Sequence, residues 1–152
     1  LGEDAPAERR GRAEIRFVPY QSSPAAVAAY YQAADVYVHA AKADTFPTTV
    51  IEALACGTPV VATSIGGIPE QIRGWSAMNP TLNTFDLDHA TGVLTSPANA
   101  EEFAAALERL LENASARSQL SENAAADARR RFGLKGQAET YLDWYQEILQ
   151  AA

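Results

Sequence analysis

Short apolar runs alternate with helix-like patterns along most of this chain of 152 residues. Runs rich in β-branched and aromatic residues predict strands, whereas apolar positions spaced three and four apart predict helices. The pattern predicts strands over residues 15–20, 36–40, 59–63 and 91–95, and helices over residues 22–34, 46–56, 69–73, 99–111, 115–132 and 136–150. Strands that alternate with helices form a parallel sheet covered by helices. We therefore predict an α/β fold, a Rossmann-like parallel sheet flanked by helices and followed by a helical C-terminus.

Punctuating residues mark the ends of several predicted elements. Ser22 or Ser23 ahead of Pro24 supplies an N-cap and a first-turn signal for a helix. Gly57 supplies the left-handed residue that ends the next helix. The run Val60-Val61-Ala62 is apolar throughout, which is typical of a strand buried on both faces of a parallel sheet.

Four segments carry weaker signals. Residues 1–12 are interpreted as a linker or a frayed helix, and residues 74–90 as a long loop or lid. Arg129–Arg131 are interpreted as a solvated helix face that interacts favourably with the helix dipole. The tyrosines and tryptophan of the last helix either dock another domain or are buried in this domain's own core.

Length and charge limit the classes of function. The chain is long enough for one domain, residues 1–152, and its net charge of −7 disfavours nucleic acid as a partner. Its single cysteine, Cys56, fits a reducing compartment, and no apolar run resembles a membrane span, so we expect a cytoplasmic protein. Peripheral membrane association stays open. His39 and His89 lack acids at metal-ligand spacing, so we expect no metal site and interpret each histidine as structural or exposed.

The most informative stretch runs from Asp44 to Thr63 and continues through Gly66-Gly67-Ile68-Pro69-Glu70. It leaves a predicted strand and enters a helix, which is where open parallel sheets bind ligands. Pro47 at the first helical position leaves the next amides free to bind a phosphate or a hydroxyl group. Asp44 precedes these amides, and Glu52 follows inside the helix. Spacing alone fits two interpretations equally well. Both acids bind a ligand, or Asp44 only offsets the helix dipole and Glu52 is an ordinary helix-surface acid.

This stretch closely resembles the C-terminal, donor-binding domain of retaining glycosyltransferases of the GT-B fold, of the group 1 or family 4 type. The resemblance extends over nearly the whole chain, because Arg16–Tyr20, Tyr31–Val36 and Thr91–Leu94 match further family segments. It implies transfer of a hexose, with retention at the anomeric carbon, from a UDP- or GDP-linked sugar to a glycan or lipid-linked acceptor, as in bacterial polysaccharide biosynthesis. It implies no cofactor, no metal and no side-chain nucleophile.

The resemblance also implies a role for each motif residue. Asp44 would contact the transferred sugar and is the candidate catalytic residue, Glu52 would bind the ribose, and the intervening amides would bind sugar and diphosphate. The predicted donor-binding set is Asp44, Thr45, Phe46, Pro47, Thr48, Thr49, Val50 and Glu52, with Tyr20 and Gln21 beside the base. Asp44 stands where the family usually has glutamate, and Gly66-Gly67 is interpreted as a tight turn rather than a ligand contact.

The chain also departs from the family pattern. The family's first two strand-helix units, which supply an arginine and a lysine for the diphosphate, are not recognisable, and neither is the N-terminal acceptor-binding domain. Lys42 is interpreted as a solvated loop lysine rather than a substitute for these cations. We therefore expect a fragment that is inactive alone and works with an acceptor-binding domain or a partner chain. The alternatives are a non-catalytic sugar-nucleotide-binding or assembly module and, less well supported by the residues, an epimerase.

Overall fold

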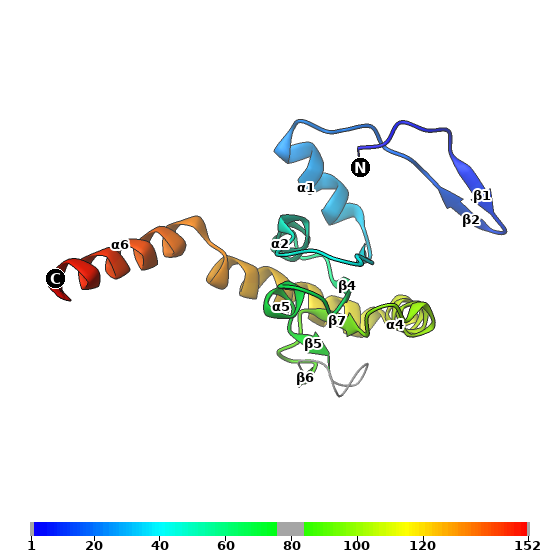
Figure 1. Ribbon diagram of the computed structural model, residues 1–152. Coiled ribbons are helices and arrows are strands. Elements are labelled where there is room, and N and C mark those ends of the chain that lie inside the picture. Colours follow the sequence, from blue (N-terminus) through cyan, green and yellow to red (C-terminus); the bar gives the residue numbers. More distant parts are fainter. Residues whose placement is uncertain (1, 76–83, 152) are drawn as a thin grey trace.

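The structure, a computed structural model, describes residues 2–75 and 84–151 (Figure 1). Its elements, in chain order, are β1 (Glu8–Arg10), β2 (Ala13–Ile15), α1 (Pro24–Ala33), β3 (Tyr37–His39), α2 (Thr48–Ala55), β4 (Val60–Thr63), α3 (Ile68–Gln71), β5 (Gly74–Trp75), β6 (Thr84–Phe85), β7 (Gly92–Thr95), α4 (Ala100–Glu112), α5 (Ala114–Arg131) and α6 (Leu134–Ala151).

A parallel sheet with strand order β3-β4-β7-β5-β6 forms the centre of the molecule. Val61 of β4 lies opposite Val38 of β3 on one side and Val93 of β7 on the other, and every pairing in this sheet is parallel. The predicted α/β, Rossmann-like class is therefore confirmed.

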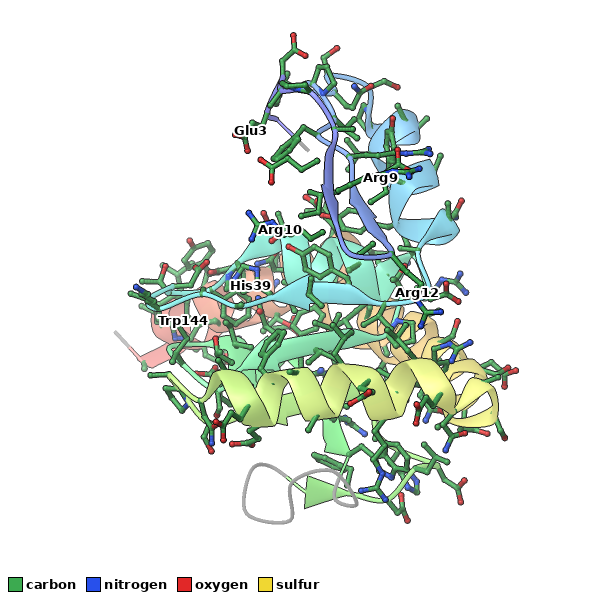
Figure 2. The ribbon with its side chains drawn as sticks, turned by 90° about the vertical axis from the view of Figure 1, so that its right-hand side faces the viewer. Glu3, Arg9, Arg10, Arg12, His39 and Trp144 are labelled. Carbon is green, nitrogen blue, oxygen red and sulfur yellow. The ribbon has the colours of Figure 1, made fainter. Side chains whose placement is uncertain are left out.

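Helices cover both faces of the sheet. Val60 and Ala62 of β4 belong to one apolar cluster, which includes residues of α1, α2, α3 and α5. Val61 belongs to a second cluster, with residues of β7, α4 and α5. Figure 2 shows α4 lying across that second face. Because all three side chains are fully buried, the prediction of a strand buried on both faces is confirmed.

The predicted helix boundaries follow from identifiable caps. The hydroxyl of Ser23 accepts a hydrogen bond from the Ala26 amide at 3.4 Å, so Ser23 is the N-cap of α1. Gly57 has φ of +77° just after α2, as the predicted stop requires. Asn99 caps α4 by accepting from the Glu102 amide at 3.0 Å.

Two expectations about the first twenty residues were wrong. Residues 8–15 form an antiparallel hairpin rather than a linker or frayed helix, with Glu8 opposite Ile15 and Gly11 in the left-handed region at φ +64°. The strand expected over residues 15–20 ends at Ile15. Residues 16–20 continue without regular structure toward α1.

The segment expected to be one long loop contains two short strands instead. Gly74–Trp75 and Thr84–Phe85 pair in parallel at the edge of the sheet. Residues 76–83, the middle of the predicted loop or lid, lie outside the described residues.

Arg131 was predicted to lie on a solvated helix face, and for this residue the prediction was wrong. Its guanidinium donates to the carbonyl oxygens of Glu70 at 2.7 Å and Gln71 at 2.6 Å, and it pairs with the buried carboxylate of Asp127 at 2.6 Å. Arg130 pairs with the same carboxylate at 2.8 Å. The hydrogen bonds of Arg131 to Glu70 and Gln71 connect the C-terminal end of α5 to the C-terminal end of α3.

The last helix extends away from the sheet (Figure 1). None of its described residues is buried, so of the two alternatives for its aromatic side chains, burial in this domain's own core is wrong. Tyr141, Trp144 and Tyr145 contact one another and are about half exposed. Across residues 2–75 and 84–151, no helix is both long and apolar enough to span a membrane.

Candidate functional site

The candidate site lies where the loops leave the carboxyl ends of β3 and β4. The loop of residues 40–47 follows β3, and the turn of residues 64–67 follows β4. The hydroxyl of Thr63, the last residue of β4, donates to the Ala41 carbonyl at 2.8 Å. The two loops are thus joined at the sheet edge where open parallel sheets bind ligands.

Gly66 and Gly67 let the second loop approach the first. Gly66 has φ of +50°, and a Cβ there would overlap the carbonyl oxygen of Asp44. The Gly67 amide donates to the Thr45 carbonyl at 2.7 Å, and a Cβ at Gly67 would lie 2.6 Å from the Phe46 ring. These contacts lie within the protein, with the backbone of Asp44 and Thr45 and the ring of Phe46, which agrees with the interpretation of these glycines as a tight turn.

The start of α2 presents free backbone donors. The helix begins at Thr48 with Pro47 as its N-cap, one residue later than predicted, and no side chain among the described residues caps it. The amides of Thr48 and Thr49 therefore lack a partner within the helix. The Val50 amide donates to the Pro47 carbonyl at 3.3 Å, so it is less available than the sequence suggested. Gln71, fully buried, donates to the same carbonyl at 3.1 Å and fixes where the helix starts.

Asp44 lies just before these donors, with 30% of its side chain exposed. Its Oδ2 is 3.3 Å from Nε2 of His39, the last residue of β3, whose side chain is 15% exposed. The opposite ring nitrogen, Nδ1, is 3.3 Å from the Tyr37 hydroxyl. His39 is thus held in place inside the site, and not simply exposed.

Glu52 lies about one turn after the start of α2 and accepts a hydrogen bond from the Tyr31 hydroxyl at 3.3 Å. It borders a hollow of about 540 Å³ between α1 and α2, lined by Tyr20, Gln21, Ser22, Pro24, Val27, Ala28, Tyr31, Glu52, Ala55 and Cys56. Three predicted donor-binding residues, Tyr20, Gln21 and Glu52, therefore come together in space.

The remaining predicted residues lie on another side of α2. Phe46 and Thr48 line a separate hollow of about 760 Å³, together with Arg130, Arg131 and residues of α6. Thr45 and Thr49 are exposed, and Pro47 and Val50 are buried. The predicted set thus surrounds the first turns of α2 instead of lining one closed pocket. Lys42 is exposed, as predicted, and borders a third hollow beside α4.

Three residues close to the acids were not in the predicted set: Tyr31, Tyr37 and His39. Tyr37 and His39 are two apart on β3 and so share one face of the strand, a signal that the sequence contained. Burial raises the pKa of Tyr31, and the neighbouring Tyr37 and Glu52 raise it further. Its phenol therefore stays protonated and donates to Glu52. Among residues 2–75 and 84–151 there is no group of three or more side chains suited to a metal ion.

Substitution of Gly66 tests whether the glycine turn shapes the site. We expect Gly66→Ala to lower the free energy of unfolding by ~2–4 kcal/mol, because alanine disfavours this backbone conformation and its methyl group meets Asp44. Urea denaturation measures the change. Gly136→Ala is the matched control, because a Cβ at Gly136 meets nothing within 4 Å. A loss below about 0.5 kcal/mol, the usual effect of a neutral surface change, would show that the close approach is dispensable.

The thiol of Cys56 reports on the hollow beside Glu52. Burial, and then the Glu52 charge, raise the pKa of Cys56, so less thiolate is present near pH 8. We expect iodoacetamide to react with Cys56 several-fold more slowly than with free cysteine, and Glu52→Gln to accelerate the reaction. Mass spectrometry follows the single cysteine, with Glu108→Gln on α4 as the control. Reaction as fast as that of free cysteine would contradict this environment.

Comparison with known proteins identifies the family. A family model described as glycosyl transferases group 1 matches residues 4–127. D-inositol 3-phosphate glycosyltransferase from Mycobacterium marinum is 31% identical over 145 residues, which cover 94% of this chain. The chain spans only 28% of that relative's length.

Solved structures show the same fold. HepE from Anabaena, in complex with UDP-glucose, superposes with a TM-score of 0.70 at 22% identity, covering 87% of this chain and 32% of HepE. The C-terminal domain of a glycosyl transferase group 1 family protein, LpcC from Francisella tularensis, superposes with a TM-score of 0.61 at 22% identity, covering 78% of this chain and 53% of that one. The chain therefore belongs to the glycosyl transferases group 1 family and matches the C-terminal portion of GT-B glycosyltransferases.

Proposed function

We propose that this chain is the donor-binding domain of a retaining hexosyltransferase that uses a UDP- or GDP-linked sugar. Family membership supports the reaction class. HepE, which shares the fold, was solved with UDP-glucose, and this supports a nucleotide-linked hexose as the donor.

The arrangement of α2 carries the proposal. The amides of Thr48 and Thr49 stand at its N-terminus without a partner among the described residues, and Asp44 lies just before them. Glu52 lies on the same helix beside the hollow that Tyr20 and Gln21 border. These features follow one another as the hollow, Glu52, the amides and Asp44. A sugar nucleotide has its base, ribose, diphosphate and sugar in the matching order.

Each feature suits one part of such a donor. The hollow would accept the base beside Tyr20 and Gln21, and the Glu52 carboxylate would accept hydrogen bonds from ribose hydroxyls. The helix N-terminus would bind the diphosphate through its amides and its dipole. Asp44 would accept hydrogen bonds from the sugar hydroxyls. Amides that bind the leaving diphosphate would also stabilise its negative charge as the bond between the sugar and the diphosphate breaks.

Turnover would need groups beyond these. In the proposed reaction the acceptor attacks from the face of the departing diphosphate, which helps to remove the acceptor's proton, so that configuration is retained without a side-chain nucleophile. We propose that a separate acceptor-binding domain or partner chain supplies a glycan or lipid-linked acceptor. The relatives named D-inositol 3-phosphate glycosyltransferase support a hydroxylated acceptor.

Substitution of Glu52 tests the function. Titration calorimetry against UDP, GDP, UDP-glucose and GDP-mannose should show binding to one nucleotide and to its sugar conjugate. We expect Glu52→Ala to weaken both about 10- to 100-fold, because hydrogen bonds to a charged group contribute about 1.5–3 kcal/mol.

Glu108→Ala, an exposed acid on α4, is the matched control and should bind like the unmodified chain. Binding that is insensitive to Glu52→Ala would place the nucleotide elsewhere. Failure of the unmodified chain to bind any of the four compounds would contradict the proposed function.

A further inference from the structure

A row of polar and aromatic side chains connects the two acids. Glu52 accepts from the Tyr31 hydroxyl at 3.3 Å, and the Tyr31 ring meets the Tyr37 ring edge to face, with centroids 5.4 Å apart. The Tyr37 hydroxyl is 3.3 Å from Nδ1 of His39, whose Nε2 is 3.3 Å from Asp44. The row crosses the edge strand β3, on which Figure 2 labels His39.

The chemistry of these groups sets the direction of their hydrogen bonds. An ionised carboxylate only accepts, so the His39 nitrogen that faces Asp44 must carry a proton to interact favourably. In a neutral imidazole the other nitrogen, Nδ1, then accepts from the Tyr37 hydroxyl. Tyr37 therefore selects the ring form that can donate to Asp44.

The contact between His39 and Asp44 is close but not aligned. Nε2 of His39 is buried, and among the described residues no group makes a hydrogen bond of good geometry with it, although Asp44 Oδ2 is within ion-pair distance. Such an unsatisfied buried donor favours any rotation of the Asp44 carboxylate that completes the bond. With Oδ2 turned toward His39, Oδ1 is left for a ligand.

We propose that His39 is a positioning residue for Asp44, and that it sets how tightly the site holds the sugar part of its donor. This inference rests on the proposed function. The aspartate side chain is one methylene shorter than glutamate, so its carboxylate needs a fixed orientation to meet a sugar hydroxyl. His39 supplies that orientation from the end of β3. At the other end of the row, Tyr31 orients Glu52 toward the nucleotide in the same way.

The two ends of the row predict different binding defects. Loss of the His39 donor should weaken binding of the sugar nucleotide about 10-fold and leave the free nucleotide within twofold, because only the conjugate reaches Asp44. Loss of the Tyr31 hydroxyl should weaken both compounds by the same factor, because both contain the ribose. A purely structural role would not separate sugar nucleotide from nucleotide.

The experiment is titration calorimetry on the 152-residue chain, with UDP against UDP-glucose and GDP against GDP-mannose. The variants are His39→Leu, His39→Asn, His39→Gln and Tyr31→Phe. Glutamine can place an amide donor near the position of Nε2, whereas asparagine is too short, so we expect only His39→Gln to restore preference for the conjugate. His89→Leu and Tyr30→Phe are matched controls, since His89 pairs with Asp86 at 2.7 Å outside the site and Tyr30 is exposed beside Tyr31.

Asp44→Asn supplies a second measurement. Once Asp44 is replaced, adding His39→Asn should cause no further loss of sugar-nucleotide binding, because the positioned group is gone. Circular dichroism tests whether each variant folds. If His39→Leu does not fold, His39→Asn and His39→Gln still test the proposal.

The outcomes separate the two levels of the proposal. Unchanged binding of both nucleotide and conjugate in His39→Asn contradicts the positioning role and leaves the proposed function standing. Equal loss of both compounds also contradicts the positioning role, because it places His39 at the nucleotide end or in the fold. If the unmodified chain binds none of the four compounds, the proposed function fails and the inference fails with it.

Discussion

The close approach of the Gly66-Gly67 turn to the backbone of Asp44 and Thr45 determines the shape of the candidate site. A side chain at Gly66 would overlap the Asp44 carbonyl, and the Gly67 amide bonds to Thr45. This contact ties the loop after β3 to the loop after β4, at the carboxyl edge of the sheet. The backbone of Asp44 is therefore held in place by the neighbouring turn.

Helix α2 fixes the position of the second acid, Glu52, relative to Asp44. Its start is fixed by the buried Gln71, which donates to the Pro47 carbonyl, and one face of α2 packs in the core through Val50, Ala53 and Leu54. A buried helix face restricts rotation, so Glu52 keeps a constant direction relative to the free N-terminal amides. In the proposed binding mode, two acids from one short stretch thus serve opposite ends of an extended ligand. Tyr31 donates to Glu52, and in the proposed arrangement His39 would orient Asp44.

Local signals explain how much of this could be predicted from sequence. Ser23 and Gly57 act within a few residues, and the apolar run of β4 needs no partner to be recognised, so the fold class and most helices were predicted correctly. The hairpin of residues 8–15 and strands β5 and β6 have two or three residues per strand, too few for a periodic pattern. The pairing of His39 with Asp44 depends on how the loop folds back, which spacing does not reveal. The donor-binding roles of Asp44 and Glu52 remain predictions.

In the proposed binding mode, one sugar nucleotide extends along the N-terminal half of α2, from the hollow at Tyr20 to Asp44. Amide NMR spectra of the ¹⁵N-labelled chain, recorded during addition of UDP-glucose and, separately, GDP-mannose, test this placement residue by residue. We expect one compound to shift the signals of Gln21, Thr48 and Thr49 together and to leave those of α4 unchanged. Shifts centred on α4 or α6, with Thr48 and Thr49 unaffected, would contradict this binding mode.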